Sequence, residues 1–173
     1  KNVFSEKTEI KPINLYARTK NLFHNYLKNK KINYKWLRIF YLFGDGENRK
    51  RLFPLMIINA NKKLNFKLKY PHFKTDFIYI KTLSKIISRL IKKNINGDFN
   101  VCRGKSIKLS NILKILDKNF IKKNKKLFNK KKKLDYEEIK GSITKIKRIN
   151  CYIESNFNKD VKKYLKSFKY ISP

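Results

Sequence analysis

The sequence is poor in the residues that build metal sites and disulfide frameworks. Its 173 residues include 2 cysteines and 2 histidines. Cys102 and Cys151 lie far apart with no Cys-x-x-Cys partner, and His24 and His72 offer no zinc-like spacing. We therefore predict no metal site and two free thiols, as in a cytoplasmic protein.

Long apolar runs are missing as well. No stretch approaches the roughly 18–20 consecutive apolar residues needed to span a bilayer. The first residues also lack the continuous apolar core of a signal peptide. Hydrophobic residues still make up 41% of the chain and aromatic residues 14%, which favours a packed globular structure. We expect one domain, or a part of a larger one, with no membrane partner.

Acidic residues are scarce: 12 Asp and Glu stand against 45 Lys and Arg, so the formal net charge is +33. Such an excess is typical of proteins that bind nucleic acid or anionic membranes. The lysines are nevertheless spread along the chain, with one dense segment at 118–133, and alanine occurs only twice. This composition suggests genome-wide drift of codons toward A and T, a hypothesis that a balanced base composition of the gene would contradict. We expect no specific nucleic-acid partner, although a basic nucleic-acid-binding protein stays an alternative.

The residues that are present form one chemically suggestive pair, Tyr16 and Lys20. A spacing of four places both side chains on the same face of a helix. A lysine ammonium beside a phenol favours the phenolate, which makes a tyrosine usable as a proton donor and acceptor near neutral pH. Alone the pair is a weak signal, because Tyr-x-x-x-Lys arises by chance in a chain with 10 Tyr and this many Lys.

The hydrophobic pattern alternates between helix and strand, which predicts the α/β class. Helical periodicity is found at 15–29, 49–61, 83–91, 110–120, 143–149 and 161–168, and strand-like runs at 33–43, 77–80 and 98–102. We expect Pro12 in the first turn of the first helix and Ser110 as the cap of the fourth. Residues 1–11 are expected to be irregular.

Four motifs in order resemble the C-terminal part of an extended short-chain dehydrogenase/reductase, the NAD-dependent nucleotide-sugar epimerase/dehydratase family. The motifs are Tyr16-Ala-Arg-Thr-Lys20, Trp36-Leu-Arg-Ile-Phe-Tyr-Leu-Phe-Gly44, Asp76-Phe-Ile-Tyr-Ile80, and Gly97-Asp-Phe-Asn-Val101 with Gly104-Lys-Ser-Ile-Lys-Leu109. The resemblance runs from about residue 6 to residue 120, with a looser similarity at 143–168. It implies a Rossmann-like sheet with a small substrate-binding domain.

The resemblance also implies roles for particular residues. Tyr16 would be the general acid/base on a sugar hydroxyl, while hydride passes to or from the nicotinamide of NAD or NADP. Lys20 would bind the nicotinamide ribose and favour the ionised tyrosine. Phe40 is then a candidate cofactor contact and Tyr41 a candidate substrate contact, with core packing the alternative for both. Arg49 and Arg51 are candidates for the diphosphate of a nucleoside-diphosphate sugar, with a solvated surface role the alternative.

The chain also departs from the family pattern. Relatives begin with a strand and a Gly-rich turn that holds the dinucleotide pyrophosphate, whereas all five glycines here follow Tyr16. The Ser or Thr expected upstream of the tyrosine is absent. Relatives often carry an arginine where this chain has Thr75, and an acidic residue where it has Lys81 or Thr82. Substrate recognition is the property these changes put in doubt.

We therefore expect a C-terminal fragment: a truncated product, a partial gene prediction, or half of a split enzyme. Residues 1–48 would end the Rossmann-like domain, and residues 49–173 would form the substrate-binding part, including the lysine-rich segment. We expect no tight NAD binding and no turnover by the chain alone, and intact relatives would form homodimers. The predicted activity is nucleotide-sugar epimerisation, dehydration or reduction for glycan or lipopolysaccharide synthesis. The alternative from the same family is a non-catalytic remnant.

Overall fold

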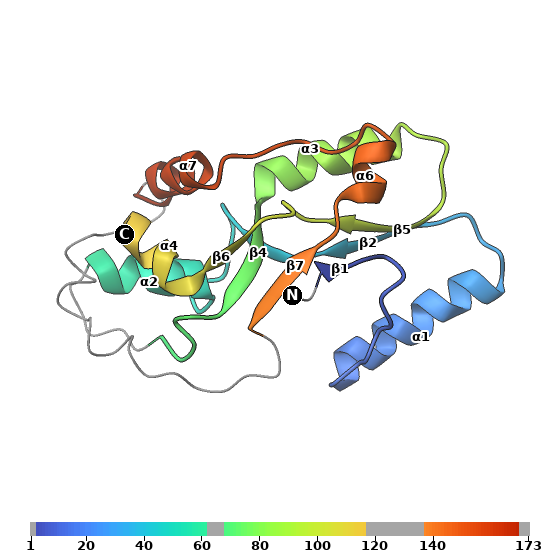
Figure 1. Cartoon of the computed structure of the whole chain (residues 1–173), viewed down its shortest axis with the longest axis horizontal. Coiled ribbons are helices and arrows are strands. Elements are labelled where there is room, and N and C mark those ends of the chain that lie inside the picture. Colours follow the sequence, from blue (N-terminus) through green and yellow to red (C-terminus); the bar gives the residue numbers. More distant parts are fainter. Residues whose placement is uncertain (1–2, 62–67, 117–136, 170–173) are drawn as a thin grey trace.

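The computed structural model describes residues 3–61, 68–116 and 137–169 of the chain (Figure 1). Helices and strands alternate along these residues, so the predicted α/β class is confirmed. The lysine-rich segment 118–133 and the end of the predicted fourth helix, around Phe120, lie outside the described residues.

The elements follow one another in this order. They are β1 (Val3–Phe4), α1 (Leu15–Asn29), β2 (Lys35–Ile39), β3 (Tyr41–Phe43), α2 (Leu52–Asn61), β4 (Lys74–Tyr79), α3 (Ile80–Ile91), β5 (Gly97–Val101), β6 (Ser106–Lys108), α4 (Leu109–Leu116), β7 (Glu138–Gly141), α6 (Thr144–Arg148) and α7 (Phe157–Lys169). The predicted strand at 77–80 does run directly into a helix, because β4 ends at Tyr79 and α3 begins at Ile80.

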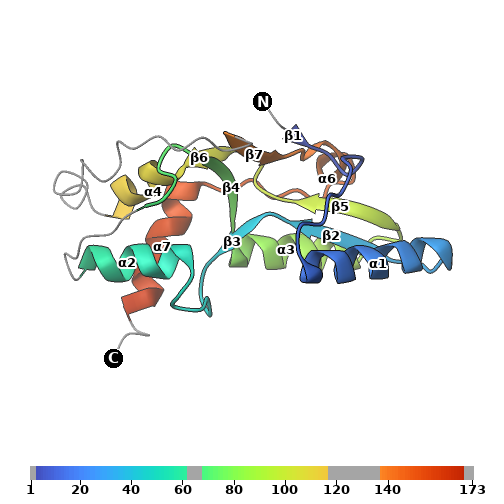
Figure 2. The same cartoon turned by 90° about the horizontal axis from the view of Figure 1, so that it is seen from below.

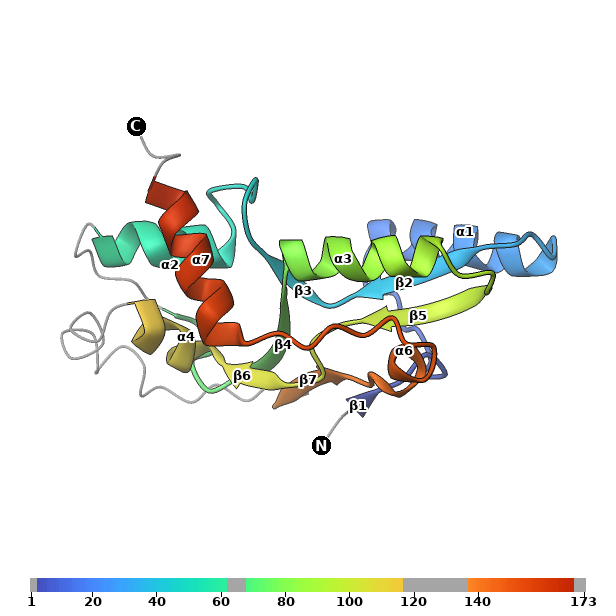
Figure 3. The same ribbon diagram turned by 90° about the horizontal axis from the view of Figure 1, so that it is seen from above.

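The strands form two sheets. A five-stranded sheet has the order β1-β7-β4-β3, with β6 added antiparallel to β4. The other pairs of that sheet are parallel, as is the two-stranded sheet of β2 and β5. In Figure 1, α3 and α6 lie on one side of β2 and β5, and α1 lies on the other. Figure 3 shows α7 packed across α2 at the far end of the molecule.

The predicted strand at 33–43 is divided in two by the tertiary structure. β2 pairs with β5, whereas β3 pairs with β4, so the chain changes sheets at Phe40. The Phe40 N–H still donates to the Val101 carbonyl at 3.2 Å. The sequence pattern does not show this change, because the run of strand-forming residues continues through Phe40 and the change depends on the distant partners of each half.

Three local predictions at element ends are wrong. Residues 1–11 are not wholly irregular, since Val3–Phe4 pairs with Lys140 and Gly141 of β7. Pro12 precedes α1, whose cap is Asn14: its Oδ1 accepts the Ala17 N–H at 2.9 Å. Ser110 lies inside α4, which begins at Leu109.

Helix α1 turns its apolar side outward. Five of its large hydrophobic residues are more than half exposed: Leu15 79%, Tyr16 69%, Leu22 70%, Phe23 56% and Tyr26 52%. The one buried side chain of α1 is His24. The predicted helix is therefore confirmed, but the apolar stripe that identified it does not face the sheet.

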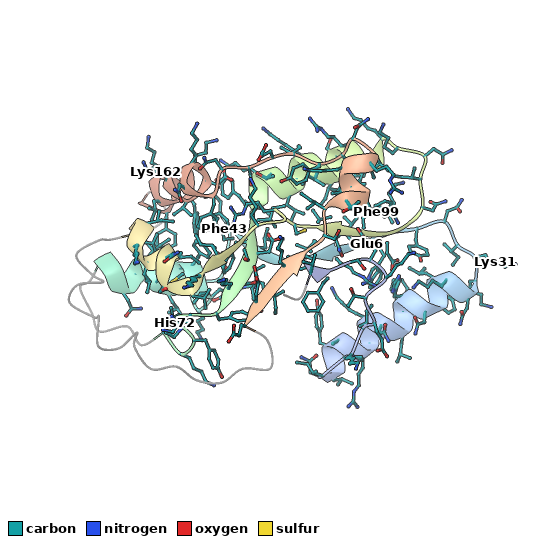
Figure 4. All side chains as sticks on the ribbon, viewed as in Figure 1. Glu6, Lys31, Phe43, His72, Phe99 and Lys162 are labelled. Carbon is teal, nitrogen blue, oxygen red and sulfur yellow. The ribbon has the colours of Figure 1, made fainter. Side chains whose placement is uncertain are left out.

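Two hydrophobic cores hold the described elements together. The larger one joins β3, β4 and the helices α2, α4 and α7 around stacked aromatic rings such as Phe43 and Phe53, whose centroids are 4.5 Å apart. The smaller one packs α3 and α6 on β5 around Ile86, Phe99 and Ile146. Phe43 and Phe99, labelled in Figure 4, lie in these two separate cores.

Asp76, on β4 and fully buried, joins three segments of the sheet. Its Oδ1 accepts the Arg103 N–H at 2.9 Å, and its Oδ2 accepts the N–H groups of Gly104 at 2.8 Å and Gly141 at 3.4 Å. Burial raises the pKa of Asp76 to about 6, although the three backbone donors act in the opposite direction.

This raised pKa predicts a loss of stability with increasing pH. The folded chain holds the Asp76 proton up to about pH 6, whereas an unfolded aspartate releases it near pH 3.9. The stabilisation is thus complete below about pH 4 and disappears as the pH rises through 6, a change of about 3 kcal/mol. Urea unfolding at pH 4 and pH 7 should show this difference, and Asp76→Asn should remove it. Equal pH profiles for the two proteins would contradict the prediction.

Candidate active site

Tyr16 and Lys20 lie side by side on α1, as their spacing predicts. The Lys20 ammonium stands over the face of the Tyr16 ring, 4.8 Å from its centroid. This is a cation–π contact, and the phenolic oxygen itself is left free to meet a ligand. Tyr16 is 69% exposed. The pair therefore presents a phenol and an ammonium outward from the surface of α1, available to a bound molecule.

Phe40 and Tyr41 follow β2, and the change of sheets separates their environments. The Phe40 ring is half-buried and packs on β7, so that a Cβ on Gly141 would come within 2.8 Å of its Cζ. Tyr41, on β3, is 43% exposed, and its ring centroid is 5.5 Å from that of Phe77. Phe40 thus has the packing contact named as its alternative, while Tyr41 keeps an accessible ring.

Arg49 and Arg51 stand in the exposed turn before α2. The Arg51 guanidinium pairs with Glu47 at 3.6 Å. In Figure 2, β3 lies between α2 and α1. The structure brings Tyr16 and Lys20 together, and both arginines are exposed.

Two positions that were expected to depart from the family pattern, Lys81 and Thr75, have different environments. Lys81 forms an ion pair with Asp45 at 3.6 Å, and the Tyr79 hydroxyl donates to the same carboxylate at 3.4 Å. Ser167 of α7 also donates to Asp45. These contacts fix the Gly44–Gly46 loop against α3 and α7. Thr75 is fully buried, and its Oγ1 has no hydrogen-bond partner among the described residues.

One polar cluster, which was not predicted from the sequence, lies under α1. His24 Nε2 is 2.6 Å from Asp98 Oδ1, and Arg38 Nη2 donates to Asp98 Oδ2 at 3.3 Å. His24 is buried in this cluster. A signal was present in the strands: Trp36 and Arg38 alternate on β2, and Asp98 and Asn100 alternate on β5, which puts all four on one face.

No group of three His, Cys, Asp or Glu side chains in the described residues could hold a metal ion. In the same residues, no helix is long and apolar enough to cross a membrane.

Solved structures of sugar-nucleotide enzymes share this fold. UDP-N-acetylglucosamine 4-epimerase from Methanobrevibacter ruminantium superposes with a TM-score of 0.80 at 20% identity, over 96% of this chain and 57% of that one. dTDP-glucose 4,6-dehydratase from Bacillus anthracis gives 0.82 at 16%, over 98% and 57%. UDP-glucuronic acid 4-epimerase from Bacillus cereus, in complex with UDP-glucuronic acid and NAD, gives 0.79 at 19%, over 99% and 58%.

The chain therefore spans less than two thirds of the length of these structures. No curated protein sequence matches it at a significant level. The sequence model of the NAD dependent epimerase/dehydratase family matches residues 1–102, which is more than half of the 173 residues. This chain belongs to the NAD dependent epimerase/dehydratase family.

Proposed function

We propose that the chain is the C-terminal part of an NAD- or NADP-dependent enzyme that epimerises, dehydrates or reduces a nucleoside-diphosphate sugar. The observation that carries the proposal is the outward-facing Tyr16–Lys20 pair on α1, in a chain whose family match includes that helix. In this proposal residues 1–48 contribute the catalytic helix, and residues 49–173 contribute the sugar-nucleotide side. The two parts share a sheet, because β5 returns to pair with β2.

The chemistry follows from the two side chains. The Tyr16 hydroxyl is free to take a proton from a sugar hydroxyl or to return it, and the ammonium of Lys20 supports the charge that develops on the phenol. The dinucleotide supplies hydride acceptance and donation when bound. Lys20 also has N–H donors for the ribose of that dinucleotide. Arg49 and Arg51, if they bind substrate, would contact its diphosphate as planar donors.

The described residues fit one end of the dinucleotide better than the other. Tyr16 and Lys20, which lie together on α1, would hold the nicotinamide ribose. The pyrophosphate has no matching Gly-rich turn, since all five glycines follow Tyr16 and none forms a Gly-x-x-Gly-x-x-Gly motif. We therefore propose that residues outside these 173 complete the site. The buried free thiols of Cys102 and Cys151 agree with a cytoplasmic location.

Calorimetry tests the proposal directly. The 173-residue chain should show no measurable heat with NAD, because the pyrophosphate contacts are absent. The same chain extended by the in-frame residues that precede it should bind NAD with micromolar affinity and convert a UDP- or dTDP-sugar to its epimer or 4-keto product, detected by chromatography. Tight NAD binding by the 173 residues would contradict the proposal that residues outside them complete the cofactor site. An extended chain that binds NAD and converts no sugar would instead be a non-catalytic member of the family.

A further inference from the structure

We propose that His24 is a positioning residue for Tyr16 and Lys20, acting through Asp98 and Arg38. The role assigned to Tyr16 and Lys20 rests on the proposed function. The anchor, by which we mean the contact of His24 with Asp98 and of Asp98 with Arg38, is a property of this chain. It would set the direction in which the catalytic helix presents its two side chains.

Few buried side chains attach α1 to the sheet. Its inward face carries Ala17, Asn21, His24 and Leu27, and of the fifteen residues in the helix only His24 is buried. The residues that would form an ordinary apolar seam point outward. Apolar contact is non-directional, so a helix held mainly by it would have weakly fixed rotation. A directional polar contact is needed to fix that rotation.

Two kinds of contact fix the orientation of the His24 imidazole ring. Its ring stacks on Trp36 at 4.4 Å between centroids with 10° between the planes, and Tyr34 meets its plane edge-on at 5.6 Å. The short contact of Nε2 with Asp98 fixes the ring within that plane. Nδ1 is buried and has no partner among the described residues. Nε2 is therefore the nitrogen that carries the proton donated to Asp98.

Asp98 is in turn held in place by two basic side chains, Arg38 and Lys28. Arg38 contacts its Oδ2 at 3.3 Å and donates from Nη1 to the carbonyls of Ser5 at 3.4 Å and Thr8 at 3.2 Å. Lys28 approaches the same Oδ2 at 3.8 Å. The cluster thus connects α1 with β2, β5 and the segment after β1. Two other side chains of α1 reach the same residues, Lys28 at Asp98 and Phe23 at Trp36, but both are exposed, and His24 is the one that is buried.

A rotation of α1 at His24 also moves Tyr16 and Lys20, because all three residues belong to one helix. Tyr16, Lys20 and His24 are spaced by four residues, so each is offset from the next by about 40° around the helix. A rigid rotation that breaks the His24–Asp98 contact must turn Lys20 and Tyr16 by the same angle. A turn of about 30° at a radius of 5–6 Å moves a side chain by about 3 Å. Reacting groups displaced by as little as about 1 Å lose rate by about 10²-fold.

The test measures the direction of α1 without requiring activity. Nitroxide labels on Arg18→Cys of α1 and Lys85→Cys of α3, both exposed, report the distance between the two helices by pulsed electron paramagnetic resonance. Cys102 and Cys151 are buried and should not be labelled in the folded chain. The parent should give one narrow distance distribution.

Two variants separate the hydrogen bond from the bulk of the side chain. His24→Gln places an amide N–H near the position of Nε2 and should keep the distribution narrow. His24→Asn is too short to reach Asp98, and it should raise the misoriented population by roughly 10- to 100-fold and broaden the distribution. His72→Asn makes the same change at the other histidine, which is exposed and lies away from α1 in Figure 4, and it should have no effect.

A narrow distance distribution in His24→Asn would overturn the proposal. A broad distribution in His24→Gln, or failure of that variant to fold, would also overturn it, because the hydrogen bond that this variant retains should be sufficient. If His24→Asn fails to fold, a narrow distance distribution in His24→Gln still supports the proposal. The two proposals can fail separately. If the extended chain converts no nucleotide sugar but the parent chain still gives a narrow distance distribution, the proposed function is wrong and the positioning role of the His24–Asp98 contact stands.

Discussion

Replacing Tyr16 by phenylalanine is expected to lower kcat of the extended enzyme by about 10²–10⁴-fold, the usual contribution of a positioned general acid/base. Only the hydroxyl is removed, and the Tyr16 side chain is 69% exposed, so folding should be unaffected. The cation–π contact with Lys20 is kept by the phenylalanine ring. The measurement is steady-state conversion of the nucleotide sugar, with NAD affinity determined by calorimetry on the same preparations.

The chain offers a matched control for this change. Tyr26 is on the same helix and is 52% exposed, and Tyr26→Phe removes a hydroxyl to which no role is assigned. It should retain the parent rate. Lys20→Met should reduce both kcat and NAD affinity, because the proposed lysine serves the phenol and the ribose together. A Tyr16→Phe enzyme within twofold of the parent rate would show that the proton passes through another group.

Asp76→Ala is expected to lower the free energy of unfolding at pH 7 by about 3–9 kcal/mol, because each of three donors left without an acceptor costs about 1–3 kcal/mol. The N–H groups concerned belong to Arg103, Gly104 and Gly141. Domains of this size have about 5–15 kcal/mol in total, so the variant should be close to unfolding. Urea titration followed by circular dichroism measures the loss.

Two further variants define this effect. Asp76→Asn keeps one acceptor oxygen at the site and should lose less than the alanine variant. Glu9→Ala removes a carboxylate whose side chain is 80% exposed and pairs with Lys11 only at 3.8 Å, and it should change stability little. An Asp76→Ala chain that loses less than about 1 kcal/mol would mean that water replaces the carboxylate in this part of the sheet.

Much of the local structure was predictable because its causes are local. The apolar spacing of 83–91 predicts α3, and Leu83, Ile86 and Leu90 of that helix are buried as the pattern requires. The α/β class followed from the order of helical and extended patterns. The functional pair was predictable for the same reason, since four residues always make slightly more than one helical turn.

Contacts between residues that are distant in the sequence could not be predicted. Asp76 takes its hydrogen bonds from residues 27, 28 and 65 positions away. The strand predicted as one at 33–43 is two strands, because the segments that pair with them, β5 and β4, lie much later in the chain. Neither the identity of Asp76 nor the composition of 33–43 contains information about those partners.

The sequence by itself determined that Tyr16 and Lys20 share one face of a helix, because that depends only on the period of the backbone. The tertiary structure alone decided which way this helix faces. An amphipathic pattern predicts that Leu15, Leu22 and Tyr26 turn inward, yet they are exposed and His24 is buried. The physical reason is that His24 finds Asp98 on β5 and Trp36 on β2, and folding of the chain is what brings those three residues together.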